Sequence, residues 1–254
     1  MMKTSLAVLA AAAGIVFSTP PARAEIKGEA VAYKVAGRDY EGYFAANTRV
    51  ENAPLVLLVH DWDGLDDYER RRAEMLAERG FSAFAVDLYG KGVRPTTTDE
   101  AKTESGKLYK DRDAMRVRLF AGLDEAKAMA KAATKTAIIG YCFGGSAVLE
   151  FARAGAPLDG FVSFHGGLQV PEGEDFKSVK APVLVLQGSE DPVSPIGLVA
   201  EVAQAMSRDG VAYDMQIYGG ARHAFTVWDG GDYDAKADRL SWDAMLAFFD
   251  ERLR

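Results

Sequence analysis

The stretch Gly140-Tyr141-Cys142-Phe143-Gly144-Gly145 decides the fold of this chain, and it holds the only cysteine among 254 residues. The apolar run 137–139 leads into this stretch, and a run of helical spacing, 146–151, leads out of it. A short strand, a turn with glycine two residues before and two after its central residue, and then a helix indicate a nucleophile elbow. Serine is the usual central residue of that turn, and here Cys142 takes its place.

Apolar runs alternate with segments of helical period along most of the chain. The runs expected as strands are 55–59, 81–88, 137–141, 158–164, 182–187 and 213–218, of which the first two are expected to be buried. The segments expected as helices are 67–79, 111–133, 143–153, 195–208 and 233–252. Because strands joined by crossover helices form a mainly parallel sheet with helices on both faces, the sequence predicts an α/β fold.

Two further segments have patterns of their own. Residues 30–36 and 40–46 alternate loosely between apolar and polar and are joined through 37–39, which predicts an antiparallel hairpin at the sheet edge. Residues 91–109 are polar and rich in threonine, so we expect a loop or a short lid over the strand ends.

The composition is that of a globular protein, with 48% hydrophobic and 26% charged residues. A length of 254 residues fits one α/β domain, which we expect over residues 25–254. The formal net charge of −7, with no block of basic residues, argues against a nucleic-acid partner. The oligomeric state is left open by the sequence.

Residues 1–24 have the pattern of a secretory signal peptide. Lys3 supplies a basic start, the apolar run 6–17 is short for a bilayer span, and Ala22-Arg23-Ala24 is a small-x-small cleavage site. We expect a mature chain that begins at Glu25, is periplasmic or secreted, and has no stable membrane association. An uncleaved membrane anchor is the alternative interpretation.

The single cysteine bears on function. A chain exported with one cysteine cannot form an internal disulfide, so Cys142 is either a buried structural thiol or a thiol that is used. Its place in a glycine-flanked elbow favours use as a nucleophile. A redox-responsive or non-catalytic protein with a reactive thiol at Cys142 remains the alternative function.

A nucleophilic thiol needs a base and an acid that orients the base. In this type of sheet the ligand site lies at the carboxyl ends of the strands, so residues that follow different strands converge there. His223 follows the last predicted strand and Asp191 follows the strand before it. The order Cys142, Asp191, His223 therefore matches nucleophile, acid and base.

Other residues at strand ends compete for these roles or line the pocket. His60 and His165 are the rival bases, each directly after a predicted strand, and both are expected at the pocket wall if they are not the base. Glu190 is the rival of Asp191, but neighbouring residues at a strand end point to opposite sides. Tyr89 follows the strand 81–88 and is expected at the same pocket.

The oxyanion of an acyl-transfer reaction needs two donors. In an elbow they are the backbone N–H after the nucleophile, here Phe143, and one from the loop after an earlier strand, where Trp62 stands. The acidic run 61–67 invites a calcium hypothesis but lacks the glycine and glutamate positions of an EF-hand loop. We therefore expect a solvated helix start there, and no metal.

Four motifs in order resemble the dienelactone hydrolase family of α/β-hydrolases. They are Gly-Tyr-Cys-Phe-Gly-Gly at 140–145, Asp-Leu-Tyr-Gly at 87–90, Gly-Ser-Glu-Asp-Pro at 188–192 and Ala-Arg-His-Ala-Phe at 221–225. The resemblance covers roughly residues 30–253 and implies an α/β-hydrolase fold. It also implies cofactor-free hydrolysis of an enol lactone or activated ester through a Cys-His-Asp triad and an acyl-cysteine intermediate.

The chain departs from the family pattern at the substrate pocket. Asp61 stands where family members carry a glutamate that interacts with the thiol, so it is expected to gate thiolate formation. The family holds a substrate carboxylate with two arginines, and the corresponding positions here are Lys91 and a site near Val227. Because valine cannot bind a carboxylate, a neutral ester or lactone is as open as a carboxylate-bearing one.

Overall fold

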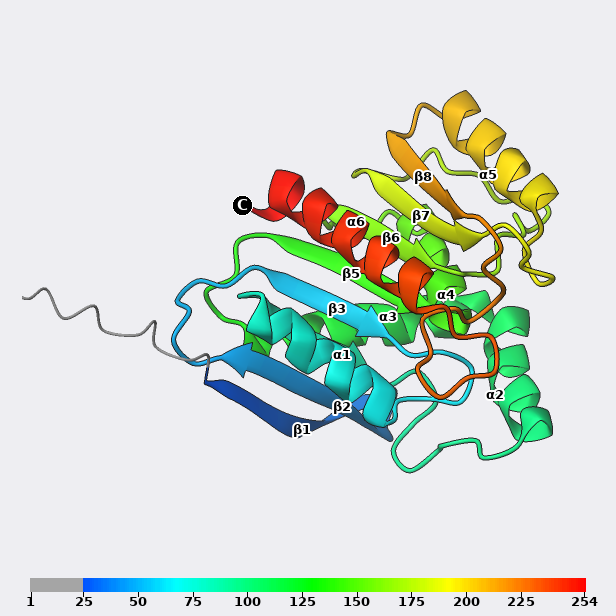
Figure 1. The fold of residues 1–254 in the computed structure, drawn as a ribbon. Coiled ribbons are helices and arrows are strands. Elements are labelled where there is room, and N and C mark those ends of the chain that lie inside the picture. The colour runs from blue at the N-terminus through cyan, green and yellow to red at the C-terminus, as the bar shows by residue number, and fades with distance from the viewer. Residues whose placement is uncertain (1–24) are drawn as a thin grey trace, which may run out of the picture.

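The computed structural model describes residues 25–254, so the predicted signal peptide, 1–24, lies outside the described residues. The described strands form one eight-stranded sheet in the order β1-β2-β4-β3-β5-β6-β7-β8 (Figure 1). Their bounds are β1 Ile26–Val35, β2 Arg38–Asn47, β3 Leu55–Val59, β4 Ser82–Val86, β5 Thr136–Tyr141, β6 Gly160–Phe164, β7 Val183–Gly188 and β8 Tyr213–Tyr218. From β4 across to β8 neighbouring strands are parallel, which confirms the predicted sheet.

The N-terminal hairpin is confirmed. β1 pairs with β2 in antiparallel register from Ile26 opposite Asn47 to Val35 opposite Arg38. The turn is tighter than predicted, because only Ala36 and Gly37 connect the strands, with φ of 46° and 80°. Positive φ at both turn residues matches the right-handed twist of the flanking strands. β2 then pairs antiparallel with β4 and joins the hairpin to the parallel part of the sheet.

Helices cover both faces of the sheet (Figure 1). Their bounds are α1 Asp67–Glu78, α2 Thr98–Lys110, α3 Arg112–Met129, α4 Phe143–Arg153, α5 Ile196–Arg208 and α6 Ala235–Leu253. All of β3 is buried, and its side chains alternate between two cores. Leu57 packs in the core under α3, α4 and α5, whereas Leu58 packs in the core under α1 and α6. The apolar runs 55–59 and 81–88 thus contain strands buried on both faces, whereas β8, at the sheet edge, is mostly exposed or half-buried.

The prediction of a loop over residues 91–109 is wrong, because α2 occupies most of that segment. Thr97 caps the helix by accepting a hydrogen bond from the Glu100 N–H at 3.3 Å, and the Glu100 carboxylate accepts from the Thr97 N–H at 3.2 Å. This reciprocal pair satisfies N–H groups that the first helical turn leaves unpaired. Ala101 and Leu108 are buried beneath the helix, so a mostly polar sequence still forms a packed amphipathic helix.

The acidic run 61–67 includes a helix start, as expected. Asp66 caps α1 by accepting a hydrogen bond from the Tyr68 N–H at 2.7 Å, and Glu69 accepts from the Asp66 N–H at 3.0 Å. Within residues 25–254, no group of three His, Cys, Asp or Glu side chains is arranged to hold a metal ion. No helix in the same part of the chain is long and apolar enough to cross a membrane.

Candidate active site

The elbow places Cys142 between the end of β5 and the start of α4. Its backbone has φ of 50° and ψ of −111°, a conformation that residues other than glycine rarely adopt. Such a residue stores about 1–3 kcal/mol of strain and persists only where its surroundings hold it. The Cys142 N–H donates to the Phe164 carbonyl at 3.0 Å and to Nδ1 of His165 at 3.1 Å. The neighbouring strand β6 therefore holds the strained turn.

The glycines around Cys142 are required by close backbone contacts. A β-carbon at Gly144 would lie 2.3 Å from the Val59 carbonyl oxygen, and one at Gly140 would lie 2.2 Å from the Gly144 carbonyl oxygen. Real β-carbons do not approach other heavy atoms that closely, so a side chain at Gly144 would push α4 away from β3, and one at Gly140 would push α4 away from β5. The glycine pattern that marks the elbow in the sequence is thus a packing requirement of the strand-to-helix turn.

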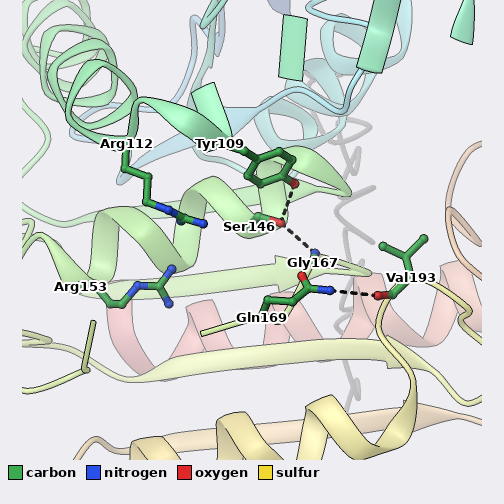
Figure 2. A pocket seen from close by; sticks show the side chains of 7 residues that line it. All are labelled: Tyr109, Arg112, Ser146, Arg153, Gly167, Gln169 and Val193. Atoms are coloured by element: carbon green, nitrogen blue, oxygen red, sulfur yellow. Dashed lines mark hydrogen bonds between the residues drawn. The ribbon is translucent and has the colours of Figure 1, made fainter. Parts of the chain in front are cut away.

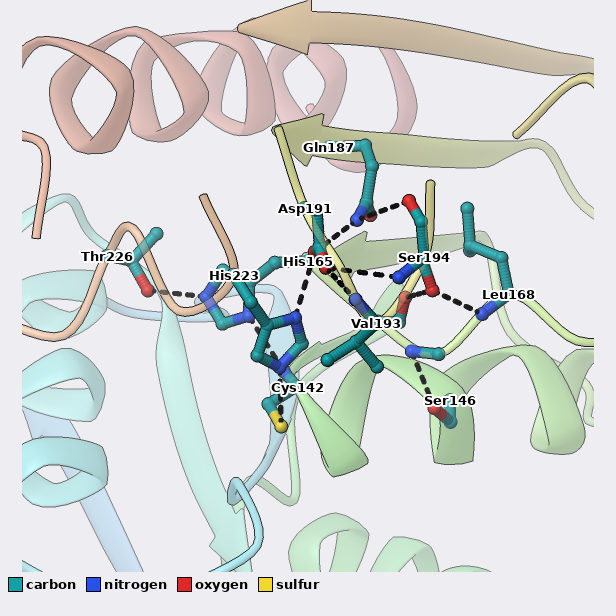
Figure 3. Close-up of polar contacts among 12 residues, drawn as sticks. Cys142, Ser146, His165, Leu168, Gln187, Asp191, Val193, Ser194, His223 and Thr226 are labelled. Atoms are coloured by element: carbon teal, nitrogen blue, oxygen red, sulfur yellow. Dashed lines mark hydrogen bonds and ion pairs between the residues drawn. The ribbon is translucent and has the colours of Figure 1, made fainter. Parts of the chain in front are cut away.

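Three residues from three strand ends form a hydrogen-bonded chain (Figure 3). Nε2 of His223 lies 3.0 Å from Sγ of Cys142, and Nδ1 of His223 lies 2.8 Å from Oδ2 of Asp191. A carboxylate only accepts hydrogen bonds, so Nδ1 carries the proton and the Nε2 lone pair faces the thiol. The structure brings Cys142, Asp191 and His223 together in the order that the sequence indicated.

Donors surround the carboxylate of Asp191. Its Oδ1 accepts from the Val193 N–H at 2.7 Å and the Ser194 N–H at 3.0 Å, and its Oδ2 also accepts from the Gln187 amide. Burial alone would raise the pKa of Asp191, but the hydrogen bond and charge of His223 and the two backbone donors outweigh it, so the pKa lies below its ordinary value. Asp191 is therefore held ionised. The rival acid Glu190 is exposed to solvent.

The two rival histidines have no nitrogen left for the thiol. Nδ1 of His60 donates to the Asp61 carbonyl at 2.6 Å, and its Nε2 accepts from the Leu88 N–H at 3.1 Å. Nδ1 of His165 accepts from the Cys142 N–H, so its Nε2 donates to the Thr226 hydroxyl at 2.8 Å. Burial lowers the pKa of both imidazoles and keeps them neutral. Both histidines hold backbone in place around the elbow.

The surroundings of the Cys142 thiol favour its uncharged form. Burial raises the pKa of Cys142 well above its ordinary value, the nearby carboxyl of Asp61 raises it further, and a hydrogen bond from the Phe143 N–H lowers it only in part. Burial, together with Asp63, also raises the pKa of the Asp61 carboxyl. Asp61 lines the same pocket as the thiol, but Sγ has its hydrogen bond with His223.

This raised pKa predicts that the Cys142 thiol is alkylated slowly at neutral pH. Reaction of Cys142 with iodoacetamide follows the thiolate fraction, and a pKa above the ordinary value leaves less thiolate at every pH. We expect the rate to be low at about pH 7 and still rising above about pH 9, without a plateau. The urea-unfolded chain is the control and should titrate near the free value of about 8.5. A plateau reached below about pH 7 would show a thiolate–imidazolium pair instead.

The thiol opens into a pocket of about 410 Å³. Of the residues singled out from the sequence, Asp61, Trp62, Cys142, Phe143 and His223 line it. The pocket is also lined by residues that the sequence did not indicate, namely Ser105, Tyr109, Val193, Ala224 and Asp232. Two of these lie on α2, and the threonine–glutamate capping pattern at its start was the signal that could have placed them.

Four predicted pocket residues lie elsewhere. Lys91 forms an exposed ion pair with Glu41 at 2.9 Å and does not line the pocket. Tyr89 is buried, and its hydroxyl donates to the Trp62 carbonyl at 3.0 Å, so it supports the loop that follows β3. His60 and His165 are fully buried behind the pocket wall. Both histidines do follow strands, β3 and β6, but their side chains are turned into the protein interior.

The sequence and the fold have counterparts among known proteins. A family model described as the dienelactone hydrolase family matches residues 40–253. The chain belongs to the dienelactone hydrolase family. A member from Aquifex aeolicus named "Putative carboxymethylenebutenolidase" is 27% identical over 234 residues, which cover 89% of this chain and 100% of that protein. A relative from Aquifex pyrophilus, "Protein usf", is 28% identical over 233 residues, with 89% of this chain and 99% of the relative covered.

Solved structures of the dienelactone hydrolase family match the same part of the chain. A dienelactone hydrolase-like promiscuous phosphotriesterase from metagenomic libraries is 32% identical, has a TM-score of 0.85, and covers 90% of this chain and 99% of its own. The parallel sheet, the antiparallel N-terminal hairpin and the helices on both faces are thus the α/β-hydrolase fold of this family, as predicted. As a member of the dienelactone hydrolase family, the protein is a hydrolase.

Proposed function

We propose that the protein hydrolyses a carboxylic ester or lactone through Cys142, His223 and Asp191, with an acyl-cysteine intermediate. The observation that carries the proposal is the 3.0 Å contact between Nε2 of His223 and Sγ of Cys142 at the pocket floor. A base within hydrogen-bond reach of the nucleophile, oriented by a third group, is the arrangement that covalent acyl transfer needs.

The proposed reaction begins with a neutral thiol. Nε2 of His223 takes the thiol proton as Sγ attacks the carbonyl carbon, and the ionised Asp191 stabilises the imidazolium that forms. The carbonyl oxygen becomes an oxyanion, for which the backbone N–H groups of Phe143 and Trp62, two residues that line the pocket, are the proposed donors. The tetrahedral intermediate then collapses, the ester C–O bond breaks, and the leaving oxygen takes the proton from His223.

The second half of the proposed cycle uses water. His223, neutral again, takes a proton from a water molecule that attacks the thioester carbon. The C–S bond breaks, the thiol is restored by the proton on His223, and the carboxylic acid leaves. Each step uses side chains and water. In a lactone the leaving oxygen stays tethered to the acyl group, so one open-chain hydroxy or oxo acid is released.

The raised thiol pKa supports this function over a redox role. Oxidant-sensing cysteines react as thiolates and have low pKa values. Burial and Asp61 shift the pKa of Cys142 the other way, so we expect the resting thiol to react slowly with oxidants.

We propose that the enzyme works after export, with residues 1–24 removed. The support is the basic start, the apolar core and the small-x-small site before Glu25. Intact-mass measurement of the protein from cells that express the full chain would find an N-terminus at Glu25. Recovery of the chain with Met1 in a cytoplasmic fraction alone would contradict export.

The proposed function is tested with a panel of lactones and p-nitrophenyl esters, each offered with and without a carboxylate on the acyl part. We expect burst release of p-nitrophenol followed by a slower steady state, because acylation precedes hydrolysis of the thioester. Mass spectrometry of the quenched enzyme should find the acyl group on the peptide that contains Cys142. Absence of turnover and of acylation across the whole panel would reject the proposal.

A further inference from the structure

A second cavity, of about 250 Å³, adjoins the active-site pocket. The two share Tyr109 and Val193 in their walls. Figure 2 shows the guanidinium groups of Arg112 and Arg153 on one side of this cavity and Val193 on the other. The cavity therefore leads from the rim of the thiol pocket to a pair of arginines, which we call the arginine chamber.

The arginine chamber carries more positive than negative charge. Arg112 and Arg153 both donate to the same oxygen of Glu150, at 2.7 Å and 2.9 Å. Glu150 is fully buried behind them, and no Asp or Glu side chain lines the chamber. Two guanidinium groups thus line the cavity, while the carboxylate with which both form an ion pair lies behind its wall.

Several hydrogen-bond donors in the arginine chamber are unused. The Arg153 side chain is 3% exposed, and its buried Nε has no hydrogen-bond partner within residues 25–254. Arg112 makes a single hydrogen bond in that part of the chain although a guanidinium has five N–H groups. The Ser146 hydroxyl accepts from Tyr109 and from the Gly167 N–H, so its own proton can be donated to a ligand.

A third arginine shows that Arg112 is not needed to neutralise Glu150. Arg116 donates to the other Glu150 oxygen and also binds Glu174 at 2.8 Å, and it does not line the chamber. Glu150 therefore keeps Arg116 and Arg153 as partners without Arg112. The Arg112 side chain is 27% exposed, so its remaining N–H groups are open to a ligand, and the buried Arg153 beside it adds positive charge. The two guanidinium groups thus form a prepared site for an anion.

We propose that the arginine chamber binds a carboxylate of the substrate that lies several bonds away from the ester carbonyl at Cys142. This inference rests on the proposed function and names its substrate class, an ester or lactone with a remote carboxylate. Lys91, the position expected from the sequence, is outside the pocket and already paired with Glu41. The anion site is therefore on the α3–α4 side of the pocket.

Helix geometry sets the length of that substrate. Cys142 directly precedes α4 and Arg153 is its last residue, so at about 1.5 Å per residue their backbones are roughly 16 Å apart along the helix. Arginine side chains on a helix reach back toward its N-terminus and shorten the gap by several ångströms. An acyl chain about the length of adipate or suberate spans the rest, whereas succinate is too short.

The test compares p-nitrophenyl monoesters of succinic, adipic and suberic acids with the esters of butyric, hexanoic and octanoic acids. We expect the ratio of kcat/KM, carboxylate ester over neutral ester, to be highest for the two longer diacids. Arg112→Gln should lower that ratio about tenfold or more, since a charge-assisted hydrogen bond is lost. A second comparison uses phenyl acetate and para-acetoxybenzoate, in which the carboxylate is on the leaving group instead. It shows which part of the substrate enters the chamber.

Arg116→Gln is the matched control, because it also removes a Glu150 partner but leaves the chamber wall intact, and its ratio should equal that of the parent. Arg112→Lys keeps the charge and should fall between the two, and thermal melting checks that each variant is folded. Calorimetric titration with adipate measures the chamber without turnover. An unchanged ratio together with unchanged adipate binding in Arg112→Gln overturns the inference. The parent protein could also show no turnover of any ester and still bind adipate, with binding that Arg112→Gln abolishes. That result would reject the proposed function but support the anion site.

Discussion

Replacement of Cys142 by alanine is expected to lower kcat/KM for p-nitrophenyl esters by at least about 10⁴-fold. Alanine has no nucleophilic atom, and the histidine at 3.0 Å from the sulfur would be left with only water to activate. Some acceleration over the buffer rate would persist from the oxyanion donors and the pocket. Initial rates against a buffer blank, with thermal melting to verify folding, measure the effect.

Cys142→Ser is the informative companion variant. The hydroxyl keeps the shape of the side chain, but an alcohol is far less acidic than a thiol and is harder for His223 to deprotonate. We expect activity between that of the alanine variant and the parent, with the acyl group now held as an oxygen ester. If Cys142→Ala hydrolysed esters at the parental rate, the nucleophile would lie elsewhere.

Asp191→Asn is expected to reduce kcat by about 10³- to 10⁴-fold. Four donors now point at the two carboxylate oxygens, from His223, Gln187 and the Val193 and Ser194 backbone. An asparagine has one oxygen and one NH₂ group, so in either orientation its N–H groups would face donors. The Nδ1–H of His223 would lose its acceptor. The imidazole would then be free to change its tautomer and present an Nε2–H, in place of a lone pair, to the thiol.

Glu190→Gln is the control for this variant. It changes a neighbouring carboxylate to an amide in the same way, but Glu190 is exposed, and the Nδ1 of His223 has Asp191 as its hydrogen-bond partner. We expect parental kcat/KM and a parental pH profile for it. Equal losses in the two variants would indicate a general effect of charge at this strand end, rather than the orienting contact between Asp191 and His223.

The positions of the reacting groups could be predicted because they depend on local pattern and chain order. Glycines two residues before and after Cys142 mark a turn in which a β-carbon would collide with backbone 2.2–2.3 Å away. The apolar runs mark buried strands, and parallel strands bring their carboxyl ends to one edge. These constraints act over a few residues, or over whole strands, and can be seen without tertiary contacts.

Helix α2 was missed for a physical reason. Its surface is polar, and only a narrow stripe that includes Ala101 and Leu108 is buried, so composition suggested a loop. Helix formation there depends on the Thr97–Glu100 cap and on packing against the core below. Tyr109, at the wall between the thiol pocket and the arginine chamber, was missed with it.

The sequence by itself determined the fold class, the elbow with Cys142 and the order in which an acid and a base follow it. Only the tertiary structure decided that His223, and not His60 or His165, faces the thiol, because the hydrogen-bond partners of each imidazole come from distant segments. The raised pKa of the thiol and the existence of the arginine chamber also depend on the tertiary structure. Burial and charge at a site are sums over neighbours that the linear chain does not bring together.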